Sequence, residues 1–149
     1  TSPRFLIEEQ VMGAPYIRDA GIIPLPMGYV ICAPGGRAGQ VGQAKLIESG
    51  ETDRVSAYAM AADSYGFGLF YLEAGSGATR PVEPQLIQAA RNSCNLTLVV
   101  GGGIRDGETA RRAAQAGADW IITGNLAEEF DDADELERVL SDFIIEMNS

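Results

Sequence analysis

The chain has 149 residues, of which 46% are hydrophobic and 21% charged, enough for one globular domain or a large part of one. No apolar run approaches the roughly 18 to 20 residues of a membrane-spanning helix, and nothing resembles a signal peptide. Histidine is absent and the two cysteines form no CxxC motif, which excludes a histidine-based triad and a structural zinc site.

The formal net charge is −10, with 21 acidic residues against 11 basic ones, and Lys45 is the single lysine. This balance argues against non-specific binding of nucleic acid, so no nucleic-acid partner is expected. It suits a protein kept soluble at high salt and equally an ordinary acidic cytosolic protein. Cys32 and Cys94 lie far apart in the sequence, and we expect both to be small apolar residues in a reducing cytoplasm.

A helix is predicted at the start of the chain. Ser2 and Pro3 are typical of a helix N-cap and first helical position, and apolar residues follow as far as Val11. Proline lacks an N–H and clashes with the preceding helical turn. Pro15 therefore predicts two helical pieces, the second of which ends before Gly21.

The first strand is expected within residues 22–33, with Gly28 to Cys32 as its pairing part because two prolines precede it. Residues 34–42 (PGGRAGQVG) match neither nucleotide-binding glycine signature and predict a mobile loop over a site. A helix from Thr52 to Tyr65 follows, with one apolar face formed by Val55, Tyr58, Ala59 and Ala62.

The next predicted elements are a strand from Leu69 to Leu72 and a helix opened by Pro84. That helix is expected to bury Leu86, Ile87 and Ala90. An amphipathic helix is predicted at the end of the chain, with acids at its positive N-terminal end. The acids are Asp131, Asp132 and Asp134, and the expected buried face comprises Leu136, Val139, Leu140, Phe143 and Ile144.

The most informative stretch is 96–128, which contains two predicted strands that each end in a turn of small residues. Residues 97–100 lead into three glycines at 101–103, and Trp120 to Thr123 lead into Gly124 and Asn125. The helix between them is predicted to open at Asp106 and Thr109 and to bury Ala110, Ala113, Ala114 and Gly117. Such turns let backbone amides converge on an anion, as do the loops after the last two strands of eight-stranded β/α barrels. The stretch predicts a phosphate site, with Arg105 as a surface or salt-bridging residue.

The pattern predicts an α/β fold with four parallel strands near residues 28, 69, 97 and 120, each followed by a helix. Four such units make half of a TIM-type (β/α)₈ barrel, whose usual size is about 250 residues. We therefore expect residues 1–149 to be the C-terminal portion of a single barrel domain whose N-terminal half lies outside this sequence.

Five segments resemble the geranylgeranylglyceryl phosphate synthase family in order and spacing. They are IPLPMGYVI at 23–31, GQVGQAKLI at 39–47, YLEAGSGA at 71–78, VVGGGIR at 99–105 and AGADWIITGN at 116–125. The resemblance implies an archaeal prenyltransferase that uses magnesium. The reaction moves a geranylgeranyl group from geranylgeranyl diphosphate to the C3 hydroxyl of sn-glycerol 1-phosphate, forming the first ether bond of the membrane lipids.

The resemblance also implies the site residues. The glycerol-phosphate segment is Tyr71, Leu72, Glu73, Ala74, Gly75, Ser76 and Gly77, the first phosphate turn is Gly102 and Gly103, and the second is Gly124 and Asn125. Glu73 and Tyr71 are the catalytic candidates, with Glu73 placed to hydrogen-bond or deprotonate the acceptor hydroxyl. Alternatively, Glu73 caps its turn or pairs with an arginine, and Tyr71 belongs to the barrel core. The family's magnesium-binding aspartate lies at the end of the first barrel strand, so no metal ligand is expected in this chain.

Two other functions stay open at this point: a bacterial heptaprenylglyceryl phosphate synthase, and a non-catalytic phosphate-binding half-barrel. Histidine- and tryptophan-biosynthesis barrels share the GGGI-like turn but not YLEAGSG. The expected partners are the two substrates, a membrane surface in transient contact, and further copies of the chain. These residues alone are expected to be inactive.

Overall fold

The computed structural model describes residues 4–149, so the helix start predicted at Ser2 and Pro3 lies outside the described residues. Four parallel strands form one sheet in the order β1 (Met27–Ile31), β2 (Leu69–Glu73), β3 (Thr97–Gly101), β4 (Trp120–Ile122). The strand order follows the chain order without the reversal found in a doubly wound sheet. This sequential winding is that of a (β/α)₈ barrel, and the predicted α/β class with parallel strands is confirmed.

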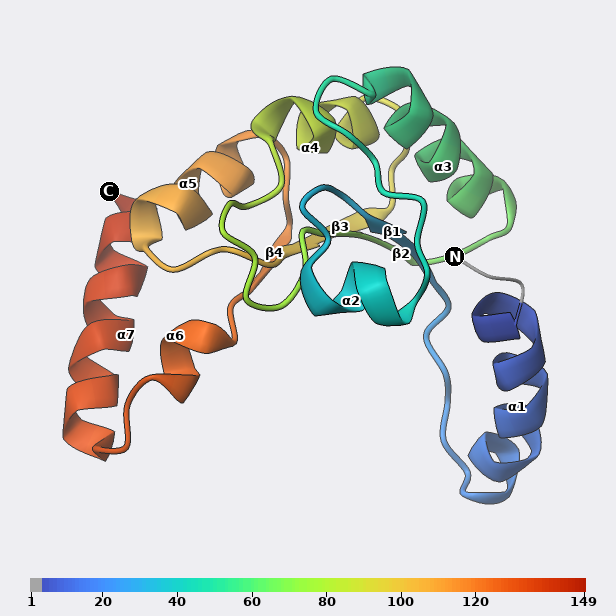
Figure 1. The fold of residues 1–149 in the computed structure, drawn as a ribbon, viewed down its shortest axis with the longest axis horizontal. Helices are drawn as coiled ribbons and strands as arrows, with labels where there is room; N and C mark the ends of the chain where they lie inside the picture. Colours follow the sequence, from blue (N-terminus) through green and yellow to red (C-terminus); the bar gives the residue numbers. More distant parts are fainter. Residues whose placement is uncertain (1–3) are drawn as a thin grey trace.

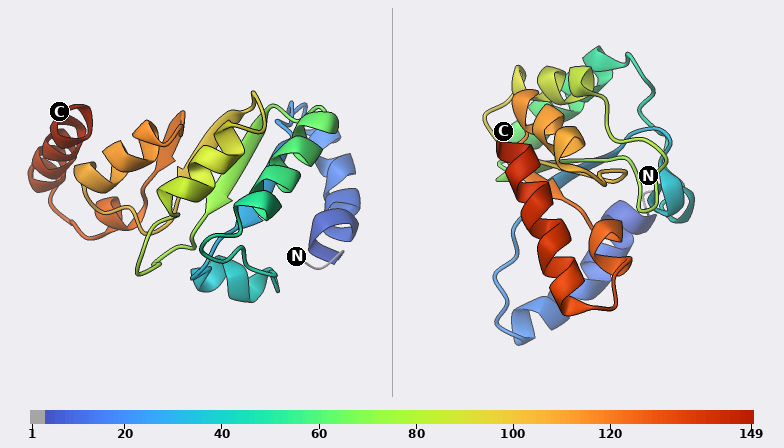
Figure 2. Two further views of the ribbon diagram at one scale, coloured as in Figure 1. Left: turned by 90° about the horizontal axis from the view of Figure 1, so that it is seen from above. Right: turned by 90° about the vertical axis from the view of Figure 1, so that its left-hand side faces the viewer.

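Helices α3 (Thr52–Ser64), α4 (Pro84–Arg91) and α5 (Gly107–Gln115) cover one face of the sheet (Figure 1). They lie side by side, α3 against α4 and α4 against α5, and α7 (Ala133–Asn148) packs against α5 (Figure 2). The main core lies between these helices and the sheet, where alternate strand residues such as Val30, Leu72 and Val100 are buried. The intervening residues point to the opposite face of the sheet.

That opposite face carries aromatic side chains. Tyr29 and Tyr71 are cross-strand partners in the β1–β2 register. Trp120, on β4, pairs with Val99 of β3. Tyr29 is 41% exposed and Trp120 54% exposed. This side of the sheet corresponds to the interior of a closed barrel.

The start of the chain differs from the prediction. A π-helical turn (Arg4–Glu8) runs directly into α1 (Glu9–Asp19), which continues through Pro15 as one helix. Proline removes the N–H that would bond to the carbonyl of Val11. Since Val11 is exposed, water can solvate that carbonyl, and the helix persists.

The glycine-rich stretch after β1 also differs, because α2 (Gly36–Val41) occupies residues predicted to form a loop. Gly35 provides the left-handed N-cap with φ +80°, and the side chain of Leu46 lies against Gly35 and Gly39. The side chain of Leu46, in the loop that follows α2, therefore packs against the helix. A further short helix, α6 (Asn125–Glu128), follows β4.

The helices that follow β2 and β3 begin where the sequence indicates. Pro84 is the first residue of α4, and the carboxylate of Asp106 caps α5 by accepting a 2.7 Å hydrogen bond from the Thr109 amide. The predicted burial is only partly confirmed. Tyr58, predicted on the apolar face of α3, is exposed, and so are Ala114 and Ile144, which were predicted to be buried. The rest of the face predicted to be buried on α7 (Leu136, Val139, Leu140 and Phe143) is only half-buried, since α7 packs mainly against α5.

Candidate active site at the carboxyl ends of the strands

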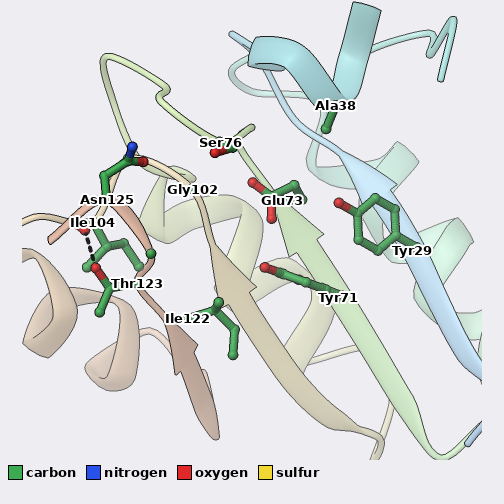
Figure 3. Close-up of a pocket in the computed structure, with 12 residues that line it drawn as sticks. Tyr29, Ala38, Tyr71, Glu73, Ser76, Gly102, Ile104, Ile122, Thr123 and Asn125 are labelled. Atoms are coloured by element: carbon green, nitrogen blue, oxygen red, sulfur yellow. Dashed lines mark hydrogen bonds between the residues drawn. The ribbon is translucent and has the colours of Figure 1, made fainter. Parts of the chain in front are cut away.

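A cavity of about 200 Å³ lies where the four strands end (Figure 3). Its lining comes from all four strands or the loops after them: Tyr29, Ala38, Tyr71, Glu73, Ser76, Gly102, Gly103, Ile104, Ile122, Thr123, Gly124 and Asn125. In parallel α/β proteins, the carboxyl edge of the sheet is the common place for ligand binding.

Glu73 is the carboxylate of this cavity. It is the last residue of β2 and only 7% exposed, and its Oε1 accepts a 2.6 Å hydrogen bond from the Gly75 amide. The carboxylate therefore caps its own turn, as one interpretation of the sequence had it. No arginine within the described residues pairs with it, so the charge is available to a ligand inside the cavity.

Two phenols lie beside this carboxylate. The rings of Tyr29 and Tyr71 meet edge to face, with centroids 5.0 Å apart and an interplanar angle of 81°. Burial raises the pKa of Tyr29 to about 12, and the nearby charge of Glu73 adds to the shift. Burial also raises the pKa of Tyr71, together with its hydrogen bond to Glu73. Both phenols therefore remain protonated at neutral pH and serve as neutral donors near the carboxylate.

The thiol just beyond the end of β1 is buried beside Glu73. Cys32 is buried, and burial with the nearby charge of Glu73 raises its pKa to about 12. A thiol with this pKa carries almost no thiolate at neutral pH. The expectation that Cys32 is a small apolar residue agrees with this environment.

The first glycine turn is shaped by close backbone approaches. Gly102 and Gly103 have φ values of +83° and +71°, which favour glycine. A Cβ on Gly103 would lie 2.6 Å from the carbonyl group of Arg80, and one on Gly102 would lie 2.6 Å from the Gly75 amide nitrogen. The turn thus packs tightly on the loop that follows β2.

The second turn is open. Gly124 has φ −118°, and a Cβ there would meet nothing within 4 Å. Hydrogen bonds tie this turn to the two preceding loops: the Gly77 amide donates to Asn125 Oδ1 at 3.1 Å, and Thr123 Oγ1 donates to the Ile104 carbonyl at 2.9 Å. The three loops therefore form one connected rim around the cavity.

The chain matches the PcrB family over residues 2–143. It belongs to the PcrB family. It is 45% identical over 133 residues to geranylgeranylglyceryl phosphate synthase of Methanobrevibacter smithii, covering 89% of this chain and 53% of that protein. The chain thus spans about half the length of the curated relatives it matches, and the resemblance found in the sequence is confirmed.

Two solved structures agree with this chain over nearly its whole length. The geranylgeranylglyceryl phosphate synthase from Thermoplasma volcanium superposes with a TM-score of 0.91 at 39% identity, covering 99% of this chain and 58% of that one. The Thermoplasma acidophilum synthase in complex with sn-glycerol-1-phosphate gives 0.92 at 34% identity, with 98% and 58% covered. The PcrB-family chain therefore has the fold of the corresponding part of these synthases.

The structure brings together most of the residues singled out in the sequence of this PcrB-family member. Those that line the cavity are Tyr71, Glu73, Ser76, Gly102, Gly103, Gly124 and Asn125. Leu72 and Ala74 are fully buried in the core and do not line the cavity, and the Ala74 amide donates to the Gly101 carbonyl at 2.9 Å. Gly75 and Gly77 contribute amides that are already bonded to Glu73 and Asn125.

Five lining residues were not identified in the sequence: Tyr29, Ala38, Ile104, Ile122 and Thr123. Tyr29 could have been found by aligning the two strand motifs, since GYVI and FYLE place their tyrosines at one register position. Ala38 carries no comparable signal, because the short helix that presents it was not predicted.

The donor set does not fit a magnesium ion held by this chain. No group of three or more His, Cys, Asp or Glu residues suited to a metal occurs in residues 4–149, and Glu73 is the single carboxylate lining the cavity. Asp132 caps α7 by accepting a 2.9 Å hydrogen bond from the Glu135 amide, a structural role as expected.

Within residues 4–149, no helix is both long and apolar enough to cross a membrane.

Proposed function

We propose that these residues form the acceptor-binding C-terminal half of a geranylgeranylglyceryl phosphate synthase barrel. The proposed reaction joins geranylgeranyl diphosphate and sn-glycerol 1-phosphate through an ether bond. The observation that carries the proposal is the cavity itself: one buried carboxylate faces two glycine turns at the carboxyl edge of a parallel sheet. Relatives named as this synthase support the same function.

In the proposed reaction, the two turns hold the phosphate of the acceptor. Backbone amides around Gly102–Gly103 and Gly124–Asn125 and the Ser76 hydroxyl are the candidate donors. Fixing the phosphate at this rim directs the glycerol carbons toward Glu73, deeper in the cavity, where Tyr71 also lies (Figure 3). Positioning of this kind removes part of the entropic barrier before the chemical step.

Glu73 is proposed as the general base. As the C3 oxygen of glycerol 1-phosphate forms its bond to C1 of the geranylgeranyl group, the bond from C1 to the diphosphate oxygen breaks. The hydroxyl proton passes to the Glu73 carboxylate, and the diphosphate leaves with the electron pair of the broken bond. Tyr71, protonated at neutral pH, donates to the carboxylate and restrains its direction.

The remaining expectations belong to the whole protein. Magnesium would neutralise the charge of the diphosphate, and we expect its ligands outside this sequence. We further propose a cytoplasmic archaeal enzyme that self-associates and contacts the membrane surface transiently to receive its lipid donor.

The general-base assignment is tested with Glu73→Gln in the full-length protein. Glutamine keeps an oxygen for the Gly75 amide but cannot take up a proton, so we expect turnover to fall about 10- to 100-fold. The affinity for sn-glycerol 1-phosphate, measured by calorimetry, should change little. Glu108→Gln, an exposed change on α5, is the control. Unchanged turnover in the Glu73 variant would show that this carboxylate is structural.

A further inference from the structure

Three arginines lie in the loops that surround the cavity, next to residues of its wall. Arg37 precedes the lining residue Ala38 in α2, and Arg105 follows the lining residue Ile104. Arg80 packs its carbonyl group against Gly103 in the first glycine turn. All three side chains are exposed, and none forms an ion pair with another residue in the described part of the chain.

The acids that follow these arginines along the chain already have partners. Glu51, Glu83 and Asp106 stand at the N-cap positions of α3, α4 and α5. Asp106 accepts from the Thr109 amide, Glu51 from the Glu48 amide and Arg54, and Glu83 from the Ser49 hydroxyl and the Gln85 side-chain amide. Among the described residues, each of the three loops therefore carries an arginine without an ion pair followed by an acid that other groups engage.

This order of charges matters because the chain as a whole carries a formal charge of −10. A molecule of that charge repels dianions at distances up to the Debye length, about 8 Å at physiological salt. Positive charges around an opening reverse the local potential and raise the rate at which anions enter. Arginine keeps its charge at any pH at which the protein is folded.

We propose that Arg37, Arg80 and Arg105 form a steering rim that accelerates the entry of small phosphate and diphosphate anions into the cavity without contacting the bound anion. The inference extends the proposed function, since both proposed substrates are anions of this class. In this proposal the arginines raise the rate of association, whereas the glycine turns hold the anion once it is in the cavity.

The test compares two triple variants of the full-length protein with the same change in charge. The rim variant carries Arg37→Gln, Arg80→Gln and Arg105→Gln; the control carries Arg18→Gln, Arg111→Gln and Arg138→Gln, exposed or partly exposed positions on α1, α5 and α7. Stopped-flow fluorescence gives association and dissociation rates for sn-glycerol 1-phosphate and for inorganic diphosphate over a range of salt concentrations. Circular dichroism confirms that both variants are folded.

We expect the rim variant to lose about tenfold in association rate at low salt and most of its salt dependence, with the dissociation rate unchanged. The control should stay within about twofold of the wild type. Equal losses in both variants would show a net-charge effect and overturn the rim. A faster dissociation alone would make the arginines direct ligands, which also overturns it. If diphosphate shows the expected pattern while glycerol 1-phosphate does not bind, the rim stands and the proposed acceptor is wrong.

Discussion

At the scale of single residues, the two glycine turns of the site differ in how much space surrounds their glycines, although the turns look alike in the sequence. Gly103 has a left-handed backbone and lies against the Arg80 carbonyl, whereas Gly124 has φ −118° and open space around its Cα. Packing requires glycine at the first position, whereas packing sets no such requirement at the second, where we propose that glycine keeps the amides accessible to the phosphate.

This contrast predicts different results for two substitutions. Gly103→Ala should lower both the thermal stability and the affinity for glycerol 1-phosphate, because its Cβ meets backbone and its φ is strained. Gly124→Val should leave the melting temperature nearly unchanged while lowering the affinity, since its side chain occupies space beside the phosphate. Calorimetry and thermal unfolding separate the two. Unaltered affinity in both variants would remove the phosphate site.

A pH dependence of stability follows from Tyr29, whose pKa rises from 10.0 to about 12 in the folded protein. Between these values the unfolded chain loses its phenolic proton while the folded protein keeps it, so unfolding is favoured as the pH rises. The contribution is fully present below pH 10 and is lost through about pH 12. Tyr29→Phe should flatten the fall in unfolding free energy over this window, measured by urea titration at each pH. An equally steep fall in the variant would contradict the assigned environment of Tyr29.

At the scale of elements, α2 is held against the loop after β2 by contacts between glycines. A Cβ on Gly36 would lie 2.8 Å from the Ser76 carbonyl oxygen, and one on Gly75 would lie 2.5 Å from the Gly36 amide nitrogen. The two loops approach backbone to backbone, which only glycine permits. This contact places Ala38 of α2 at the wall of the cavity.

Gly75→Ala should therefore displace α2, and Gly66→Ala provides a matched control. Both glycines have positive φ values, +103° and +75°, but a Cβ on Gly66 meets nothing within 4 Å. The control should lose about 1–2 kcal/mol from backbone strain alone. Gly75→Ala should lose about 1–3 kcal/mol more from overpacking, with faster hydrogen exchange in α2. Equal losses in the two variants would show that the α2 contact contributes nothing.

At the scale of the whole molecule, the sheet has two open edges within the described residues. β1 and β4 each pair on one side only, although Ile47 forms a bridge to Cys32 just beyond β1. Apolar side chains at these edges are partly exposed, including Met27, Trp120 and Ile122. Unpaired strand edges and exposed apolar surface favour association.

Residues 1–149 expressed alone are therefore expected to form dimers or larger assemblies without prenyltransferase activity. Association can cover the sheet, but the carboxylates that the proposed reaction needs for its metal are expected elsewhere in the whole protein. Light scattering gives the mass, and an ether-formation assay with magnesium gives the activity. A monomer with measurable activity would overturn both the half-barrel assignment and the placement of the metal site.

The sequence by itself determined the helices and strands whose signals are local. Asp106 caps α5 and Pro84 opens α4 because caps and first-turn prolines act within one turn of helix. The period of the apolar residues identified the parallel strands, and the YLEAGSG and GGGIR segments led to the family. The prediction of two helical pieces divided at Pro15 was wrong, because the free-energy cost of a proline in a helix depends on what surrounds the carbonyl that it leaves unpaired.

Only the tertiary structure decided which of these residues meet. Tyr29 joins Tyr71 and Glu73 through the register of two strands about 40 residues apart, and no local pattern encodes that register. The difference between Gly103 and Gly124 likewise depends on which loop packs against each turn. Local propensities act over a few residues of one segment, whereas the site is formed by close packing between loops distant in the chain.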